Sequence, residues 1–387
     1  MARWFTCFGS IILTLALVAT AQGQEKKDTA SGEKSSAGQT VDGKTAADKS
    51  AIDPSAVPEG TPKELVEFIQ KIILSMPADD EVRKKIRKAA LEAADKILAD
   101  KPNQKELNFA VQAKIHLLEK AEEIKALGEE LKKAGREKQA RIVAGFCMEN
   151  DMKTALMSGT ADMKSEIEQA LKFLGEGVAQ ESDMGLAIMI GQIAELQGNN
   201  DYAIEVYRQL GKIFSAGKDE QLVKYGKRFE GVVRRLSLPG NQMQLEGKLL
   251  TGEQLDYAKY KGKVVLVDFW ATWCSACLAE IPNLKKNYEV YHDKGFDIIG
   301  FSCDYMRKDL EQFVKEKDIP WAIVFGDDEP SPTVEYYGIL GVPMMLLVGK
   351  DGSVIDLDIR GEQLGKRLEE ILGPIEEKKN KQETDVK

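Results

Sequence analysis

The stretch that decides the fold is Val267-Asp268-Phe269-Trp270-Ala271-Thr272-Trp273-Cys274-Ser275-Ala276-Cys277. Its first residues belong to a mostly apolar run from Lys263 to Trp270. A helical pattern follows the cysteines, from Leu278 toward Tyr291. Together these patterns predict a buried strand, a short turn and a helix, with the C-x-x-C motif at the start of the helix. Two intervening residues at that position bring two sulfurs within disulfide range.

The placement of these two cysteines predicts redox chemistry. Cys274 would lie over the helix N-terminus, where free N–H groups and the helix dipole stabilise a thiolate. Cys277 lies one turn further along and can resolve a mixed disulfide. Half of a zinc site is one alternative, but a four-ligand site needs a second pair, and Cys147 and Cys303 stand apart. An inert structural disulfide is another, and the strand–turn–helix context with small intervening residues argues against it. The redox interpretation requires no metal and no cofactor.

The overall composition excludes several other classes of protein. The chain has 387 residues, enough for two or three domains, and 43% hydrophobic residues, enough for globular cores. The 54 basic and 63 acidic residues give a net charge of −9, which argues against nucleic acid or an anionic membrane as partner. Only His116 and His292 are available for histidine chemistry. The five cysteines are too few for a disulfide scaffold.

The N-terminal segment predicts export. Residues 1–3 give a short positive start through Arg3, and residues 4–24 carry no charge. Small residues follow the apolar core, as in a secretory signal peptide over 1–23. An uncleaved membrane anchor is the alternative, because the uncharged run reaches transmembrane length. In both cases the protein would work in the periplasm or another extracytoplasmic space, where a thiol pair can be held oxidised. Residues 24–60 lack aromatic side chains and predict a disordered linker.

Residues 61–238 predict an all-α domain, because apolar residues recur there at spacings of three and four. The stretch from Ile193 to Leu210 resembles a tetratricopeptide helix pair, with a small residue at the turn and then Tyr202 and Ala203. The resemblance covers about one repeat. We therefore expect a tetratricopeptide-like helical array, with another helical bundle as the alternative. Cys147 is expected in the core of this domain.

Strand-like and helical runs alternate from Pro239 onward and predict an α/β domain over residues 239–375, followed by a charged tail over 376–387. Here the chain resembles the thioredoxin family and its extracytoplasmic TlpA/ResA branch. The resemblance rests on several segments that occur in order, namely 247–263, Val267–Cys277, Glu280-Ile281-Pro282, Gly295–Ser302, Gly341-Val342-Pro343 and Lys350-Asp351-Gly352. It implies a thioredoxin-like fold for this C-terminal α/β domain, which follows the all-α helical array expected from the periodicity, and it does not cover the helical region.

The resemblance also implies roles for individual residues. Val342 and Pro343 match the cis-proline loop that faces the cysteines and pairs with substrate. Asp268 matches a buried acid that could move the proton of Cys277. Glu280 matches an acid that the TlpA/ResA branch uses near the pair, with a solvated helix residue as the alternative. Trp273, which directly precedes Cys274, is expected to support the site together with Asp268 and Glu280.

Some features stay open. Cys303 ends the strand Phe296–Ser302 and is either a third thiol near the pair or, as we favour, a small buried residue. His292 is expected at the surface or in a cap. Ala276 replaces the proline that many relatives carry, so reductase, oxidase and isomerase remain alternatives.

The function expected from these features is that of an exported thiol–disulfide oxidoreductase. Its partners would be cysteine-containing extracytoplasmic proteins and an upstream membrane electron donor. The alternative is an interaction protein whose helical domain docks a partner and whose thioredoxin-like part is a redox-sensing appendage. A peroxidase, which shares this fold, is a third alternative; it is disfavoured because Cys274 is part of a C-x-x-C pair and not an isolated cysteine.

Overall fold

The structure, a computed structural model, describes residues 56–76, 79–327 and 329–374. The predicted signal peptide, most of the predicted linker and the predicted tail lie outside these residues. No helix of the described part is long and apolar enough to cross a membrane. The chain divides into two compact units, Met1–Cys147 and Met148–Lys387, and each is described by itself. The domain bounds at 61, 238 and 375 stay a prediction.

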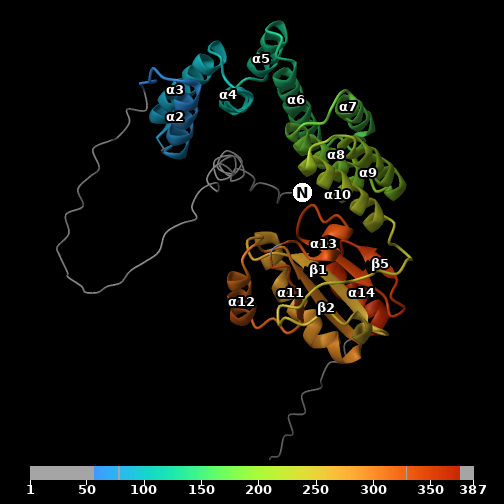
Figure 1. The fold of residues 1–387 in the computed structure, drawn as a ribbon. Coiled ribbons are helices and arrows are strands. Elements are labelled where there is room, and N and C mark those ends of the chain that lie inside the picture. Colours follow the sequence, from blue (N-terminus) through green and yellow to red (C-terminus); the bar gives the residue numbers. More distant parts are fainter. Residues whose placement is uncertain (1–55, 77–78, 328, 375–387) are drawn as a thin grey trace, which may run out of the picture. The chain divides into compact units, whose positions relative to one another are not determined.

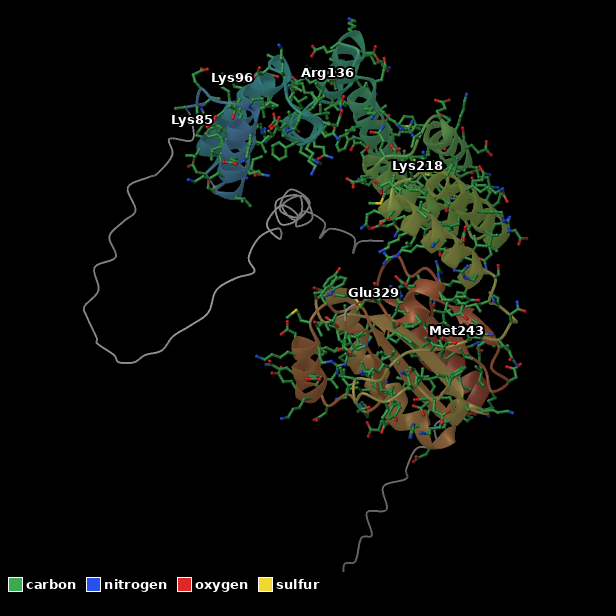
Figure 2. The ribbon with its side chains drawn as sticks, viewed as in Figure 1. Lys85, Lys96, Arg136, Lys218, Met243 and Glu329 are labelled. Atoms are coloured by element: carbon green, nitrogen blue, oxygen red, sulfur yellow. A yellow bond between two sulfur atoms is a disulfide. The ribbon has the colours of Figure 1, made fainter. Side chains whose placement is uncertain are left out.

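The first unit is helical. Its elements are α2 (Pro62–Leu74), α3 (Asp80–Ala99), α4 (Gln104–Leu117), α5 (Ala121–Lys133) and the first part of α6 (Glu137–Met157). Capping boxes begin two of these helices, formed by Thr61 with Glu64 and by Asn103 with Glu106. The guanidinium of Arg136, which is labelled in Figure 2, donates a hydrogen bond to the carbonyl oxygen of Leu98 (2.7 Å). This bond ties the turn before α6 to α3.

The second unit starts with a helical part made of the rest of α6, α7 (Lys164–Gly175), the short η1 (Glu181–Asp183), α8 (Met184–Leu196), α9 (Asn200–Ser215) and α10 (Glu220–Leu236). The stretch that resembles a tetratricopeptide pair forms α8 and α9, and the array itself stays a prediction. Tyr207 is buried among these helices and donates a hydrogen bond to Glu195 (2.8 Å), which also accepts one from buried Arg235 (3.0 Å). The buried phenol and guanidinium are thus partnered, which lowers the cost of their burial.

The thioredoxin-like α/β fold predicted for the C-terminal part is confirmed. Five strands form one sheet in the order β3-β2-β1-β4-β5, with β1 (Val264–Trp270), β2 (Phe296–Ser302), β3 (Ala322–Val324), β4 (Met344–Val348) and β5 (Val354–Leu357). Strands β1, β2 and β3 are parallel, whereas β4 and β5 run antiparallel to their neighbours. The remaining elements are η2 (Tyr257–Tyr260), α11 (Ser275–Tyr291), η3 (His292–Lys294), α12 (Arg307–Glu316), α13 (Pro332–Tyr336) and α14 (Glu362–Leu372) (Figure 1).

The central strand β1 is buried on both faces, and its alternation positions the site. Val264, Leu266 and Trp270 pack in a core cluster that also contains side chains of α11 and α14. Their neighbours along the strand pack in a second cluster, on the other face. Side chains two residues apart share a face of a strand, so Asp268 points to the same side as Trp270 and α11. A carboxyl group is thereby placed in the layer between the sheet and the helix that carries the cysteines.

Candidate active site

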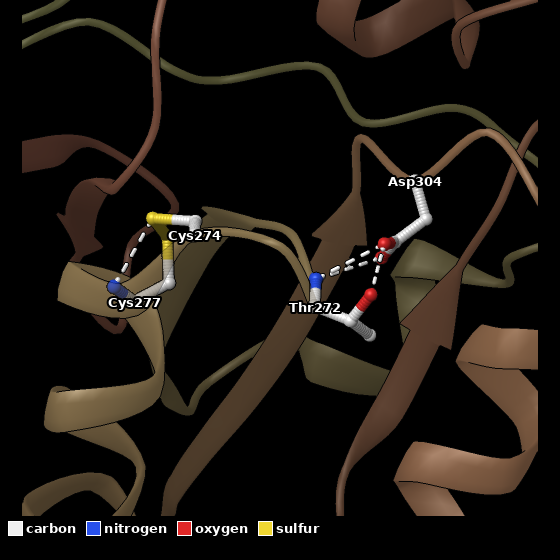
Figure 3. Close-up of a disulfide and its surroundings, with 4 residues drawn as sticks. All are labelled: Thr272, Cys274, Cys277 and Asp304. Carbon is white, nitrogen blue, oxygen red and sulfur yellow. Dashed lines mark hydrogen bonds between the residues drawn. A yellow bond between two sulfur atoms is a disulfide. The ribbon is translucent and has the colours of Figure 1, made fainter. Parts of the chain in front are cut away.

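The two cysteines of the motif form a disulfide at the start of α11. Strand β1 ends at Trp270, and Cys274 is the N-cap of the helix. The Cα atoms of Cys274 and Cys277 are 5.2 Å apart and their sulfurs are bonded (Figure 3). The Cys277 backbone N–H donates a hydrogen bond to Cys274 Sγ (3.1 Å). The same donor and the helix dipole would stabilise negative charge on this sulfur after reduction.

Both cysteines are buried, and exposed side chains lie beside them along the chain. Cys274 is 7% exposed and Cys277 2%, so the first sulfur is the more accessible. Trp273 is 57% exposed and stacks on Tyr305, with ring centroids 6.4 Å apart. Tyr305 and Met306 are exposed as well. Apolar side chains from the turns after β1 and β2 thus lie at the surface next to the pair.

A carboxylate that the sequence reasoning missed fixes the turn before Cys274. Asp304 accepts hydrogen bonds from the Thr272 backbone N–H (3.0 Å) and hydroxyl (2.5 Å) (Figure 3). It also accepts one from the Ser302 hydroxyl (2.7 Å). It therefore ties the end of β1 to the end of β2. The sequence did contain a signal for Asp304. It follows the end of β2 closely, and residues at the ends of parallel strands lie at the edge of the sheet that carries the site.

Asp268 is buried beneath the site, and its Oδ1 atom has no hydrogen-bond partner among the described residues. Burial raises the pKa of this carboxyl to about 7, with a further increase from the charge of Glu280 and an opposing effect of Arg360. A group with this pKa can both accept and release a proton near neutral pH. The predicted proton-transfer residue therefore lies in the layer below the cysteines with a proton affinity suited to that role.

Glu280 is half-buried and held from two sides. Its Oε2 atom accepts hydrogen bonds from the Gly361 backbone N–H (3.1 Å) and the Asn283 amide (3.4 Å). The same amide donates to the Gly361 carbonyl (3.0 Å), and Arg360 pairs with Asp358 (2.7 Å). The charge of Glu280 also raises the pKa of Asp268. Sequence reasoning missed Asn283 and Arg360, because they come from a helix turn and a loop with no motif.

The Val342–Pro343 peptide bond is cis, as the resemblance implied. Val342 packs against the core cluster that contains both cysteines. The loop leads directly into β4, where Met344 pairs with Phe269 near the end of β1. The predicted substrate loop therefore lies beside the end of the strand that leads to Cys274.

The other predicted candidates take less direct places. Cys303 is half-buried, and burial raises the pKa of its thiol to about 12, with smaller increases from Asp304 and Asp268 and an opposing effect of Arg228. It is therefore a neutral thiol near pH 7. Cys147 lies half-buried on α6 against a core of the first unit. The His292 ring stacks on Tyr288 and lies 3.1 Å from a backbone carbonyl.

No group of three or more side chains that could hold a metal is found among the described residues. The combination that remains is a thioredoxin-like sheet with a disulfide at the start of its central helix, a buried acid below it and a cis-proline loop beside it. Fold and site define a thiol–disulfide oxidoreductase of the thioredoxin-like class.

Comparisons with known proteins agree. The Redoxin family profile matches residues 238–372. The thiol-disulfide oxidoreductase ResA of Bacillus thuringiensis subsp. konkukian is 35% identical over 126 residues, which are 33% of this chain and 71% of the relative. ResA of Halalkalibacterium halodurans is 28% identical over 127 residues, 32% of this chain and 71% of the relative. A crystal structure of the thioredoxin domain of a thiol-disulfide oxidoreductase from Bacteroides vulgatus has 32% identity and a TM-score of 0.32, covering 35% of this chain and 97% of that one. The chain belongs to the ResA family of thiol-disulfide oxidoreductases.

Proposed function

We propose that this protein exchanges disulfides with other extracytoplasmic proteins, with Cys274 as the nucleophile and Cys277 as the resolving thiol. The observation that carries the proposal is the position of Cys274. It is the N-cap of α11, it accepts a hydrogen bond from the Cys277 N–H, and it is the less buried sulfur of the pair. All three features favour a thiolate that a client disulfide can reach.

In the reducing direction, each of the two exchange steps forms one S–S bond and breaks another. The Cys274 thiolate attacks one sulfur of a client disulfide, forms a mixed disulfide and releases the other client sulfur as a thiolate. The Cys277 thiol then loses its proton and attacks Cys274 Sγ. This second exchange releases the client dithiol and leaves the Cys274–Cys277 disulfide. The oxidising direction is the reverse sequence.

The proton of Cys277 is assigned to Asp268. This carboxyl lies on the α11 face of β1, and its pKa of about 7 lets it accept the proton near neutral pH. Glu280 supports this role, because its charge raises the pKa of Asp268. Val342 and Pro343 would present backbone to the client, and Trp273 with Tyr305 would contact apolar residues around the client cysteine.

The cellular setting belongs to the same proposal. The signal-like segment over 1–23 supports export to the periplasm or another extracytoplasmic space, with membrane anchoring if the segment is not cleaved. A chain that reduces clients must be re-reduced, so a membrane electron donor would act upstream. The client proteins would be those with exposed cysteine pairs.

The test is to trap the mixed disulfide. We expect Cys277→Ser to accumulate a covalent complex with a disulfide-bonded protein such as insulin, and Cys274→Ser to form none. Cys303→Ser is the matched control and should reduce insulin like the unchanged chain. Trapping by Cys274→Ser instead of Cys277→Ser would reverse the two assignments, and full activity of Cys274→Ser would refute the proposed function.

A further inference from the structure

Helix α10, which precedes the part of the chain that matches the Redoxin family, makes a backbone contact with the segment between α13 and the Val342–Pro343 loop. A Cβ atom on Gly231 of α10 would lie 2.5 Å from the Gly338 nitrogen. A Cβ atom on Gly338 would lie 2.1 Å from the Arg228 carbonyl oxygen, and Gly338 has a φ of +58°. Two glycines are therefore matched to each other, and neither position has room for a side chain.

A side-chain contact fixes the same segment one turn away. The Arg234 Nε donates a hydrogen bond to the Tyr336 carbonyl oxygen (2.8 Å). The guanidinium also lies over the Tyr336 ring, 4.5 Å from its centroid. The hydrogen bond satisfies a carbonyl at the end of α13, where helical partners are missing. Helix α10 thus holds both the backbone and the ring of this turn.

Apolar packing continues the contact toward the site. Leu340 packs against the core cluster of the helical part, which includes Phe229 and Val232 of α10. Only Gly341 and Val342 separate Leu340 from Pro343. Just after β2, the charge of Arg228 lowers the pKa of Cys303 against the effect of burial.

We propose that α10 is a positioning element of the redox site, and that Gly231 and Arg234 hold the segment Tyr336–Leu340 so that the Val342–Pro343 loop stays aligned with the cysteine pair. The inference rests on the proposed function of that loop as the surface on which a client pairs. A displacement at Gly338 would reach the loop through only a few residues. Leu340 packs against the helical core before the loop, and Met344 pairs with β1 after it, so the loop is the segment between them that can shift.

The test compares two glycine-to-alanine variants in the full chain. Gly231→Ala places a methyl group against backbone, whereas Gly175→Ala at the end of α7 meets only one side-chain carbon at 4.0 Å. Alanine favours helix over glycine by about 1 kcal/mol, so helix propensity does not predict a loss for either variant. Two substrates are used: insulin, which needs the loop, and the small aromatic disulfide 5,5′-dithiobis(2-nitrobenzoate), which needs only the sulfurs.

We expect Gly231→Ala to lower kcat/KM for insulin about ten- to a hundredfold, because small misplacements from remote mutations have effects of that order. The rate with the small disulfide should change less than about twofold on the same argument. Gly175→Ala should change neither. The proposal is overturned if Gly231→Ala leaves both rates unchanged, or if both rates fall by the same factor.

Arg234→Ala covers the case in which Gly231→Ala does not fold. It removes one hydrogen bond and one ring contact, so a smaller loss with insulin alone is expected. Hydrogen exchange of the backbone amides in 336–342 should also become faster. Unchanged exchange together with unchanged insulin reduction would refute the inference. In contrast, full activity of Cys274→Ser would refute the proposed function, so the two failures are distinguishable.

Discussion

Asp268 is a residue of the site whose acidity the fold changes strongly. Its pKa rises from an ordinary 3.8 to about 7, mainly through burial. The folded protein therefore binds this proton more tightly than the unfolded chain does. The associated stability is fully present below pH about 4 and is lost as the pH rises through about 7. A proton-transfer role of Asp268 would thus come at the expense of stability at alkaline pH.

Asp268→Asn should therefore stabilise the oxidised protein at pH 8 and not at pH 4. The upper bound is about 4 kcal/mol, from about three pH units at about 1.4 kcal/mol each. Urea unfolding at the two pH values measures the difference, and exposed Asp293→Asn is the matched control. Equal effects at both pH values would show that Asp268 does not carry a raised pKa.

The charged neighbours of Asp268 predict opposite shifts. Glu280 raises and Arg360 lowers its pKa, so Glu280→Gln should move the titration below about 7 and Arg360→Ala above it. Carbon-13 NMR of the Asp268 carboxyl follows this titration directly in the oxidised protein. Shifts of the same sign in both variants would contradict the arrangement of these charges.

The residue scale also shows what a sequence can predict of a site. Asp268 could be identified because a charge inside an apolar strand is costly and needs a reason. Glu280 could be placed near the cysteines by its spacing along one helix. Asn283 and Gly361 could not be identified, because the hydrogen bonds between their segments join residues about eighty positions apart and leave no local pattern. Arg360, next to Gly361, could not be identified for the same reason.

Among the elements, the turn between β1 and α11 depends on Asp304. This carboxylate accepts three kinds of hydrogen bond that tie two strand ends together. Strands β1, β2 and β4 and the start of α11 were predictable because each is a continuous local run. The tie through Asp304 was missed, since it depends on which strand ends become neighbours.

Asp304→Ala should destabilise the oxidised protein by about 3 kcal/mol, since it removes charge-assisted hydrogen bonds and leaves donors of Thr272 and Ser302 without a partner. Thermal and urea unfolding measure this loss. Exposed Asp293→Ala is the control and should change stability little. A loss no larger than that of the control would mean that Asp304 does not fix the turn.

At the scale of the whole molecule, the contacts that surround the cysteines all come from Met148–Lys387, as far as the structure describes the chain. The sequence predicted helices before an α/β domain, but no pattern pointed to the contact of α10 with the turn after α13. A backbone contact between two glycines leaves no hydrophobic periodicity in the sequence. From the sequence alone, Gly231 is an ordinary residue of a helix and Gly338 an ordinary residue of a turn.

Two truncations test the consequence. Residues 148–387 should keep the ratio of insulin to small-disulfide reduction of the full chain. Residues 239–387 lose α10 and expose Leu340 and Leu357, which pack against the helical core, so this ratio should fall. Circular dichroism first establishes that each fragment is folded. An unchanged ratio in folded 239–387 would show that the helical part does not position the site.

The central claim is that Cys274 and Cys277 form a reversible two-electron couple, and a redox titration of the full chain in dithiothreitol or glutathione buffers tests it most directly. We expect one transition in which a tenfold change in the dithiol-to-disulfide ratio takes about 30 mV. The transition should vanish in Cys274→Ser and persist in Cys303→Ser. The absence of a reversible transition, or a transition that requires Cys303, would refute the assignment of the redox couple to Cys274 and Cys277.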